Sequence, residues 1–391
     1  MSRRRAILAV AVGAVTMDTA LLGVIAPLLP DIEDRTGAGE GALGISISAY
    51  AVPVMLFSLP LGRAADMIGR RWLLIGGLLL TGAGSGLIAV TESLDVLIAG
   101  RAVQGLGSAA SWIAALAVVS DLAPPGKRGE SIGVALAATS VGSIAGPALG
   151  GVTADVLGFA APFLIVCGAS LALALAVVAV FPPEARRTAS ETPAWRTIAR
   201  STRSGIGAVA TAITFGAAGA LGVVELVAPL DLDARLGLSS TAIGLLFALS
   251  IAVDAPMSPI GGRWGDRRGR RGPAVAGLTI LAASVALLAV FASTLGAAFA
   301  LGLFGAGFSL SMAAAVPWLD EAFGALERGL GYGMLNLLYS AGYALGPLIA
   351  GAVLELGSAD LAYLVTAALL AAGAIAVVAW ARASTTIAPS S

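Results

Sequence analysis

Three acidic side chains stand inside otherwise apolar stretches of the sequence: Asp18, Glu225 and Asp254. Burial in hydrocarbon disfavours the charged form of a carboxyl group, so such a group can take up a proton near neutral pH. When ionised, the same group can bind a cationic amine instead. Because the two uses compete, they can couple proton movement to cation movement. We predict that these acids act in proton coupling; the alternative for each is a hydrogen bond to a neighbouring helix.

Arg101 also interrupts an apolar stretch, in the segment Arg-Ala-Val-Gln-Gly-Leu-Gly that it begins. An arginine in hydrocarbon costs about 2.5–3.5 kcal/mol on insertion scales and persists mainly where it finds a partner. We predict that Arg101 also acts in proton coupling. The alternative is a structural pair with the backbone or with Gln104.

Membrane-spanning helices are the elements that would position these residues. The chain has 391 residues, of which 58% are hydrophobic and 12% charged, and its mean hydropathy is +0.94. Soluble domains carry about 25% charged residues. Since a helix crosses a bilayer with about 20 apolar residues, we predict twelve spans and no soluble domain. The predicted spans cover residues 6–30, 42–62, 72–90, 96–120, 131–154, 156–181, 206–230, 236–262, 272–292, 295–319, 329–354 and 361–381.

The distribution of basic residues predicts the orientation of these spans. With both termini on one side, every Lys and Arg except Arg35, Arg101 and Arg235 lies on that same side. Basic residues concentrate in cytoplasmic loops of membrane proteins. We therefore predict a multi-pass protein of the cell (inner) membrane with both termini in the cytoplasm.

An internal repeat relates the two halves of the chain. The segment from Gly62 to Arg71 recurs in similar form from Gly262 to Arg271, and several glycines recur at the same spacing of 200 residues. Parallel repeats of this kind are related by an axis along the membrane normal. We predict an all-α membrane protein of two six-helix bundles, residues 1–181 and 206–391, joined by a cytoplasmic linker over residues 182–205.

The repeated loop GxxxDxxGRR resembles the signature of the major facilitator superfamily. This resemblance implies alternating access, in which two bundles rock about a central cavity, and it implies that the loop acts as a latch at the inner gate. The loop needs Gly62 and Gly69 because a tight cytoplasmic turn demands close packing or unusual backbone angles. The alternative to a latch is a turn that only fixes topology. The loop residues are Gly62, Asp66, Gly69, Arg70 and Arg71, with Asp266 in the second half.

Two further motifs resemble those of proton-coupled drug exporters: RxxQGxG from Arg101, and GxxxGPxxGG over residues 142–151. In the second motif, glycines four residues apart let another helix approach closely, and the proline kinks the span. The resemblance implies a dry helix contact that blocks proton leak. Ordinary packing of small residues is the alternative. The motif residues are Gly142, Gly146, Pro147 and Gly150, echoed by Gly346 and Pro347.

The segment from Asp18 to Pro30 resembles the DxxLLxVxxPxxP of the vesicular monoamine transporters, and Glu225 resembles an acid in their seventh span. This chain departs from that family where the family has acids in spans 10 and 11 and a lysine in span 2, so monoamine specificity is not implied. The resemblance does imply an acid-bearing cavity and proton exchange, and the aromatic residues of the spans suit such a cavity to lipophilic cations. We predict that it is lined by Asp18, Tyr50, Gln104, Glu225, Asn336 and Tyr339.

Composition excludes several other chemistries. The chain has no His and one cysteine, Cys167, which excludes imidazole metal sites, an intrachain disulfide and a cysteine zinc cluster. Zero net charge argues against nucleic-acid binding. The sequence has no phosphate-binding loop, which disfavours ATP as the energy source. We predict no cofactor, no metal and no enzyme activity.

The predicted function is proton-coupled antiport that exports lipophilic, cationic small molecules across the lipid bilayer, carried out by a monomer. One alternative is a proton-coupled symporter that takes up a small metabolite. Another is a membrane protein that does not transport, such as a sensor or an intramembrane enzyme.

Overall fold

The computed structural model describes residues 3–123, 128–182, 205–323 and 328–386, and a few side chains within these ranges, including that of Asp66, lie outside the description. Every element in the described ranges is a helix, which confirms the all-α prediction. The chain divides into two compact units, residues 1–191 with 237–248, and residues 192–236 with 249–391.

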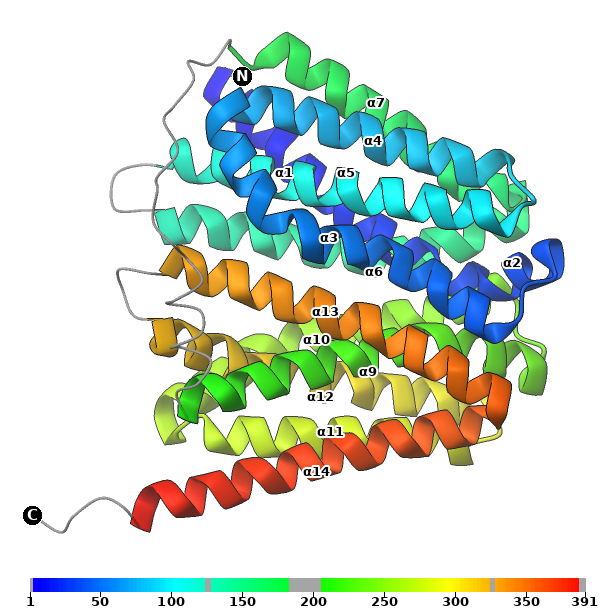
Figure 1. Ribbon diagram of the computed structural model, residues 1–391, viewed down its shortest axis with the longest axis vertical. Coiled ribbons are helices and arrows are strands. Elements are labelled where there is room, and N and C mark those ends of the chain that lie inside the picture. Colours follow the sequence, from blue (N-terminus) through cyan, green and yellow to red (C-terminus); the bar gives the residue numbers. More distant parts are fainter. Residues whose placement is uncertain (1–2, 124–127, 183–204, 324–327, 387–391) are drawn as a thin grey trace, which may run out of the picture. The chain divides into compact units, whose positions relative to one another are not determined.

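The first unit contains the helices of the first half of the chain (Figure 1). They are α1 (Arg3–Val24), the short 3-10 helix η1 (Ala26–Leu28), α2 (Leu29–Thr36), α3 (Glu40–Ile68), α4 (Arg70–Val90), α5 (Leu94–Asp121), α6 (Arg128–Leu157) and α7 (Ala160–Val180). The unit also includes the first part of α10, up to Ala248.

The second unit contains α9 (Gly205–Leu236), the rest of α10 (Ser240–Arg268), α11 (Arg271–Val290), α12 (Thr294–Phe323), α13 (Arg328–Leu356) and α14 (Ala359–Thr386). Within the described ranges, eleven stretches are long and apolar enough to cross a membrane by length and composition. The helix α6 is also long, with 30 residues, so the long helices match the twelve predicted spans in order.

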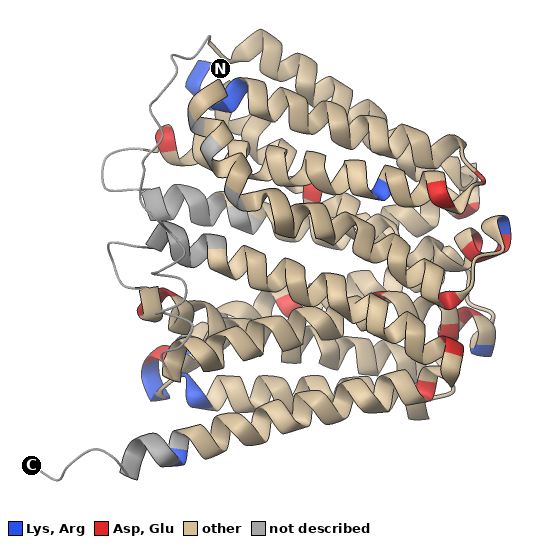
Figure 2. Ribbon diagram, in the orientation of Figure 1, with Lys and Arg blue, Asp and Glu red and all other residues tan. Residues whose placement is uncertain are grey.

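Charged residues gather at the ends of the helices, and few lie along their middles (Figure 2). This is the distribution expected when the middle of each helix contacts hydrocarbon, where charged side chains are costly. The few charged residues in the middles of helices must therefore be stabilised by contacts inside the protein.

The two GxxxDxxGRR loops each turn at their second glycine. Gly69 has a φ of 90° between α3 and α4, and Gly269 has a φ of 84° between α10 and α11. Backbone angles of this kind favour glycine. Gly62 instead lies inside α3, where an added Cβ would meet no heavy atom of the described side chains and backbone within 4 Å. The expectation that both glycines serve the turn is therefore wrong for Gly62.

The glycines of the GxxxGPxxGG motif bring α6 against α1 within the first unit. A Cβ at Gly142 would overlap the Thr16 carbonyl oxygen, and one at Gly146 would overlap that of Ala20. At Gly150, a Cβ would lie 3.1 Å from the Cα of Val24. The two backbones are thus in direct contact, as close packing through small residues requires.

The second unit repeats this contact between α13 and α9. A Cβ at Gly342 would overlap the carbonyl oxygen of Phe215, and one at Gly346 would overlap that of Gly219. The ring of Pro347 packs against Gly222. The repeated glycines therefore set the same helix contact in both units.

We predict that Gly146→Val lowers the thermal unfolding temperature of the detergent-solubilised protein. The valine side chain overlaps the α1 backbone, and overpacking of this kind costs about 1–3 kcal/mol or more. Gly76→Val is the matched control, because a Cβ at Gly76 meets no atom of the described residues within 4 Å. An unfolding temperature for Gly146→Val equal to that of the control would contradict the contact.

Candidate functional site

Asp18 lies in the middle of α1 and is buried, with 6% of its surface exposed. Its carboxyl group hydrogen-bonds with the side chain of Ser108 on α5. The hydroxyl of Tyr50, on α3, donates a hydrogen bond to Ser108 Oγ at 2.7 Å. The Oδ1 atom of Asp18 has no hydrogen-bond partner among the described residues.

Arg101 lies in the same unit and is fully buried. Its Nη1 donates to Gln104 Oε1 at 2.9 Å, and Gln104 Nε2 donates to Ser85 Oγ at 2.9 Å. The guanidinium carbon lies 4.6 Å from the centre of the Tyr50 ring, a cation–π geometry. Tyr50 therefore contacts Arg101 through its ring and Ser108, the partner of Asp18, through its hydroxyl.

The glycines of the RxxQGxG motif explain how these side chains meet. A Cβ at Gly105 would overlap the carbonyl oxygen of Tyr50, so α3 packs directly on α5 at this point. A Cβ at Gly107 would contact the backbone of Gly77 and Thr81 on α4. Close approach on both sides of α5 places the Tyr50 ring over Arg101 and brings Ser85 to Gln104.

Glu225 lies in α9 of the second unit and is also buried, with 6% of its surface exposed. Its carboxylate accepts a hydrogen bond from the hydroxyl of Tyr343 on α13. The Tyr339 and Tyr343 rings stack with centroids 6.4 Å apart, and Phe308 meets Tyr339 edge-on at 6.5 Å. An acid beside a group of aromatic rings has the composition of a site for organic cations.

Asp254, predicted for proton coupling, and Asn336, predicted for the cavity, lie in the second unit as well. Asp254 is half-buried in α10, and Ser309 Oγ of α12 donates to its backbone carbonyl at 3.0 Å. Asn336 is half-buried in α13, one turn before Tyr339. The predicted residues thus form two groups, one around Asp18 and one around Glu225, each within its own unit.

The two loops of the repeated signature carry equivalent ion pairs. Arg70 Nε lies 2.9 Å from Asp121 Oδ2, and Arg270 Nη1 lies 3.3 Å from Glu321 Oε2. The first pair joins the turn between α3 and α4 to the C-terminal end of α5. The second pair joins the turn between α10 and α11 to the C-terminal end of α12. The side chain of Asp66 lies outside the described residues, so its predicted role as a latch stays a prediction.

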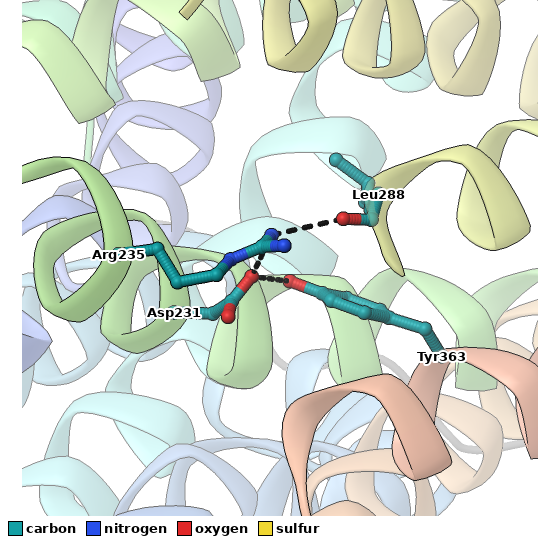
Figure 3. A network of polar contacts seen from close by, with 4 residues as sticks. All are labelled: Asp231, Arg235, Leu288 and Tyr363. Atoms are coloured by element: carbon teal, nitrogen blue, oxygen red, sulfur yellow. Dashed lines mark hydrogen bonds and ion pairs between the residues drawn. The ribbon is translucent and has the colours of Figure 1, made fainter. Parts of the chain in front are cut away.

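Sequence reasoning missed a third polar group, formed by Asp231, Arg235 and Tyr363 in the second unit (Figure 3). A signal for it was present, because Asp31 and Arg35 stand 200 residues earlier at the same spacing. Among the described residues, no group of three His, Cys, Asp or Glu side chains is placed to hold a metal ion.

Comparison with known proteins agrees with this architecture. The chain is 36% identical to the MFS-type transporter ppzB of Metarhizium rileyi over 161 residues, which cover 40% of this chain and 33% of that protein. The match thus spans only about a third of that relative. The chloramphenicol resistance protein of Streptomyces lividans is 30% identical over 364 residues, 90% of each chain.

A crystal structure of the nucleoside transporter NupG has the same fold, with a TM-score of 0.80 at 12% identity over 97% of this chain and 100% of that one. The sequence model of the Major Facilitator Superfamily matches residues 8–224 and again residues 207–390, once for each half of the repeat. This chain therefore belongs to the Major Facilitator Superfamily.

Proposed function

We propose that this protein is a proton-coupled antiporter that exports lipophilic, cationic small molecules by alternating access. In this proposal, the group around Asp18 and the group around Glu225 bind proton and substrate in turn. The bundles are residues 1–181 and 206–391, joined by the linker at 182–205. The protein works as a monomer in the cell membrane with both termini in the cytoplasm.

The burial of Asp18 is the observation that carries this proposal. A buried carboxylate is strongly disfavoured unless it is paired or protonated. Ser108 supplies one hydrogen bond, while Oδ1 has no partner among the described residues. This oxygen is therefore free to take a proton or to face a cationic ligand, and it cannot do both at once. Mutual exclusion of this kind is what antiport requires.

The network around Arg101 supports the same mechanism. Arg101 supplies a fixed positive charge in the unit that holds Asp18, and Gln104 and Tyr50 keep it in place. Through Tyr50 and Ser108, a change of charge at Asp18 is transmitted to the packing of α3 and α5. In this way, protonation of Asp18 can move α3 relative to α5.

The group around Glu225 supports the cationic class of substrate. The carboxylate supplies negative charge, and the rings of Tyr339, Tyr343 and Phe308 supply faces on which a cation is stabilised by about 0.5–2 kcal/mol each. A cation that binds Glu225 competes with the Tyr343 hydroxyl for the carboxylate. Substrate binding is thereby linked to the α9–α13 contact.

Two features support export over uptake. The GxxxGPxxGG motif is present and packs tightly against α1, as a sealed helix contact requires. A relative that matches over 90% of both chains is named for resistance to an antibiotic. Removal of a toxic compound from the cell is the simplest physical basis for resistance by a transporter.

We predict that Asp18→Asn abolishes coupled transport, because an amide cannot exchange a proton for a cation. The measurement uses everted vesicles with a preformed pH gradient. Ethidium should collapse this gradient in vesicles with the wild-type protein, and the rate of collapse should be at least tenfold lower with the variant. Asp95→Asn, which removes an exposed acid at the start of α5, is the control. Normal gradient collapse by Asp18→Asn would clear this residue of coupling.

We also predict that Glu225→Gln weakens ethidium binding about tenfold or more, because a cation loses its buried counter-charge. Binding of chloramphenicol, which is uncharged, should change less than twofold. Tyr343→Phe keeps the ring and the carboxylate and should leave ethidium affinity within a few-fold of the wild type. Equal losses for both compounds in Glu225→Gln would indicate a structural role for Glu225 in place of charge recognition.

A further inference from the structure

A buried polar network ties the C-terminal end of α9 to two other helices of the second unit. The Asp231 carboxylate pairs with Arg235 one turn later and accepts a hydrogen bond from the Tyr363 hydroxyl of α14 at 3.1 Å (Figure 3). Arg235 Nη2 also donates to the Leu288 carbonyl of α11 at 2.9 Å. Asp231 is 8% exposed and Tyr363 is fully buried. We call Asp231, Arg235 and Tyr363 the α9 anchor.

The bond to Leu288 has a clear physical basis. The last four carbonyl groups of a helix have no partner within that helix. Leu288 is the third residue from the end of α11, and Arg235 satisfies its carbonyl. A cation at this end of the helix is also favoured by the helix dipole. Arg235 therefore joins the ends of α9 and α11 while it pairs with Asp231.

The first unit has the same acidic and basic residues, but with other partners among the described residues. Asp31 accepts a hydrogen bond from Ser240 Oγ at 2.9 Å. Arg35 pairs with Glu92 at 3.6 Å, and its guanidinium carbon lies 4.7 Å from the centre of the Phe159 ring. The position that corresponds to Tyr363 is Phe163, which has no hydroxyl. Since the first unit forms the same helices without this hydroxyl, helix formation does not require the bond that Tyr363 makes.

Pro229 lies between the α9 anchor and Glu225. Proline has no N–H, so the hydrogen-bond ladder of α9 lacks its bond to the carbonyl of Glu225, four residues earlier. Asp231 follows Pro229 by two residues, and the two acids are about 9 Å apart along the helix axis. The helix is thus held by Tyr343 before its weak point and by Tyr363 after it.

We infer that the α9 anchor holds the C-terminal end of α9 fixed, so that the helix bends at Pro229 when Glu225 exchanges Tyr343 for a proton or a cation. Asp231, Arg235 and Tyr363 are then positioning residues that act through Glu225. This inference rests on the exchange proposed above for Glu225. Without the anchor, the whole of α9 shifts when Glu225 releases Tyr343, and the bend that drives the next step is lost.

A double-mutant cycle on ethidium transport in reconstituted vesicles tests this inference. Tyr363→Phe removes the anchoring hydroxyl and installs the residue type of the first half, while Pro229→Ala restores the ladder bond. We expect each variant to lower the maximal rate about tenfold with KM within twofold. The double variant should be no slower than the slower single variant, because both changes remove the same bend. The inference would be overturned if the double variant lowered the maximal rate by the product of the two single effects. It would also be overturned if a higher KM, and not a lower maximal rate, explained the slower transport.

Arg35→Gln is the matched control, since Arg35 occupies the equivalent position of the first unit, and it should leave the maximal rate unchanged. A second measurement needs no substrate. By hydrogen exchange, backbone amides of residues 230–236 should exchange at least tenfold faster in Tyr363→Phe, while those of residues 206–222 stay as in the wild type. Unchanged exchange at 230–236 would overturn the anchor. If the wild-type protein moves no ethidium against a proton flux, the proposed function fails, and the exchange result still decides whether the anchor exists.

Discussion

The cost of placing charge in an apolar interior governs the polar architecture of this protein. Hydrocarbon does not solvate a carboxylate or a guanidinium, so every buried charge must find its partners inside the protein. Arg101 does so through Gln104 and the Tyr50 ring, and Glu225 does so through Tyr343. Asp18 differs because one of its oxygens has no partner among the described residues. A charge without its full set of partners responds to protons and to cations, and the proposed coupling depends on this response.

The internal repeat supplies a scaffold that is shared, and the chemistry lies where the halves differ. Gly105 and Gly305 both pack on a backbone carbonyl of a neighbouring helix, those of Tyr50 and Ser250. The ion pairs of Arg70 and Arg270 also correspond. In contrast, the residue 200 positions after Asp18 is an alanine, and the residue 200 positions before Glu225 is an isoleucine. Each unit therefore carries its own acid at its own depth on the same set of helix contacts.

Much of the fold could be predicted from the sequence because its signals are local. Runs of about 20 apolar residues predict spans, and the fixed spacing of the repeat predicts two equivalent halves. The glycines at 142, 146 and 150 predict a close helix contact, although the sequence alone does not show that α1 is the partner. Gly62 was misjudged because its motif ends in a turn, yet the helix continues past it.

The side-chain networks could not be predicted in the same way, because they join residues that are far apart in the chain. Ser108 looks like an ordinary small residue of α5 until α1 and α3 bring Asp18 and Tyr50 to it. Comparing the halves suggests an Asp–Arg pair in both, but a single hydroxyl at Tyr363 in place of Phe163 separates them. Such differences depend on tertiary packing, which spacing along the chain does not encode.

The contact between Gly105 and Tyr50 has a consequence for how this protein can change. The atoms nearest to a Cβ added at Gly105 are the carbonyl oxygen, the carbonyl carbon and the Cα of Tyr50, all of them main-chain atoms. A larger residue at position 105 would therefore separate α3 from α5. A different side chain at position 50 would instead deprive Arg101 and Ser108 of a partner. Neither position can vary alone, so a new cargo has to be accommodated through side chains other than these two.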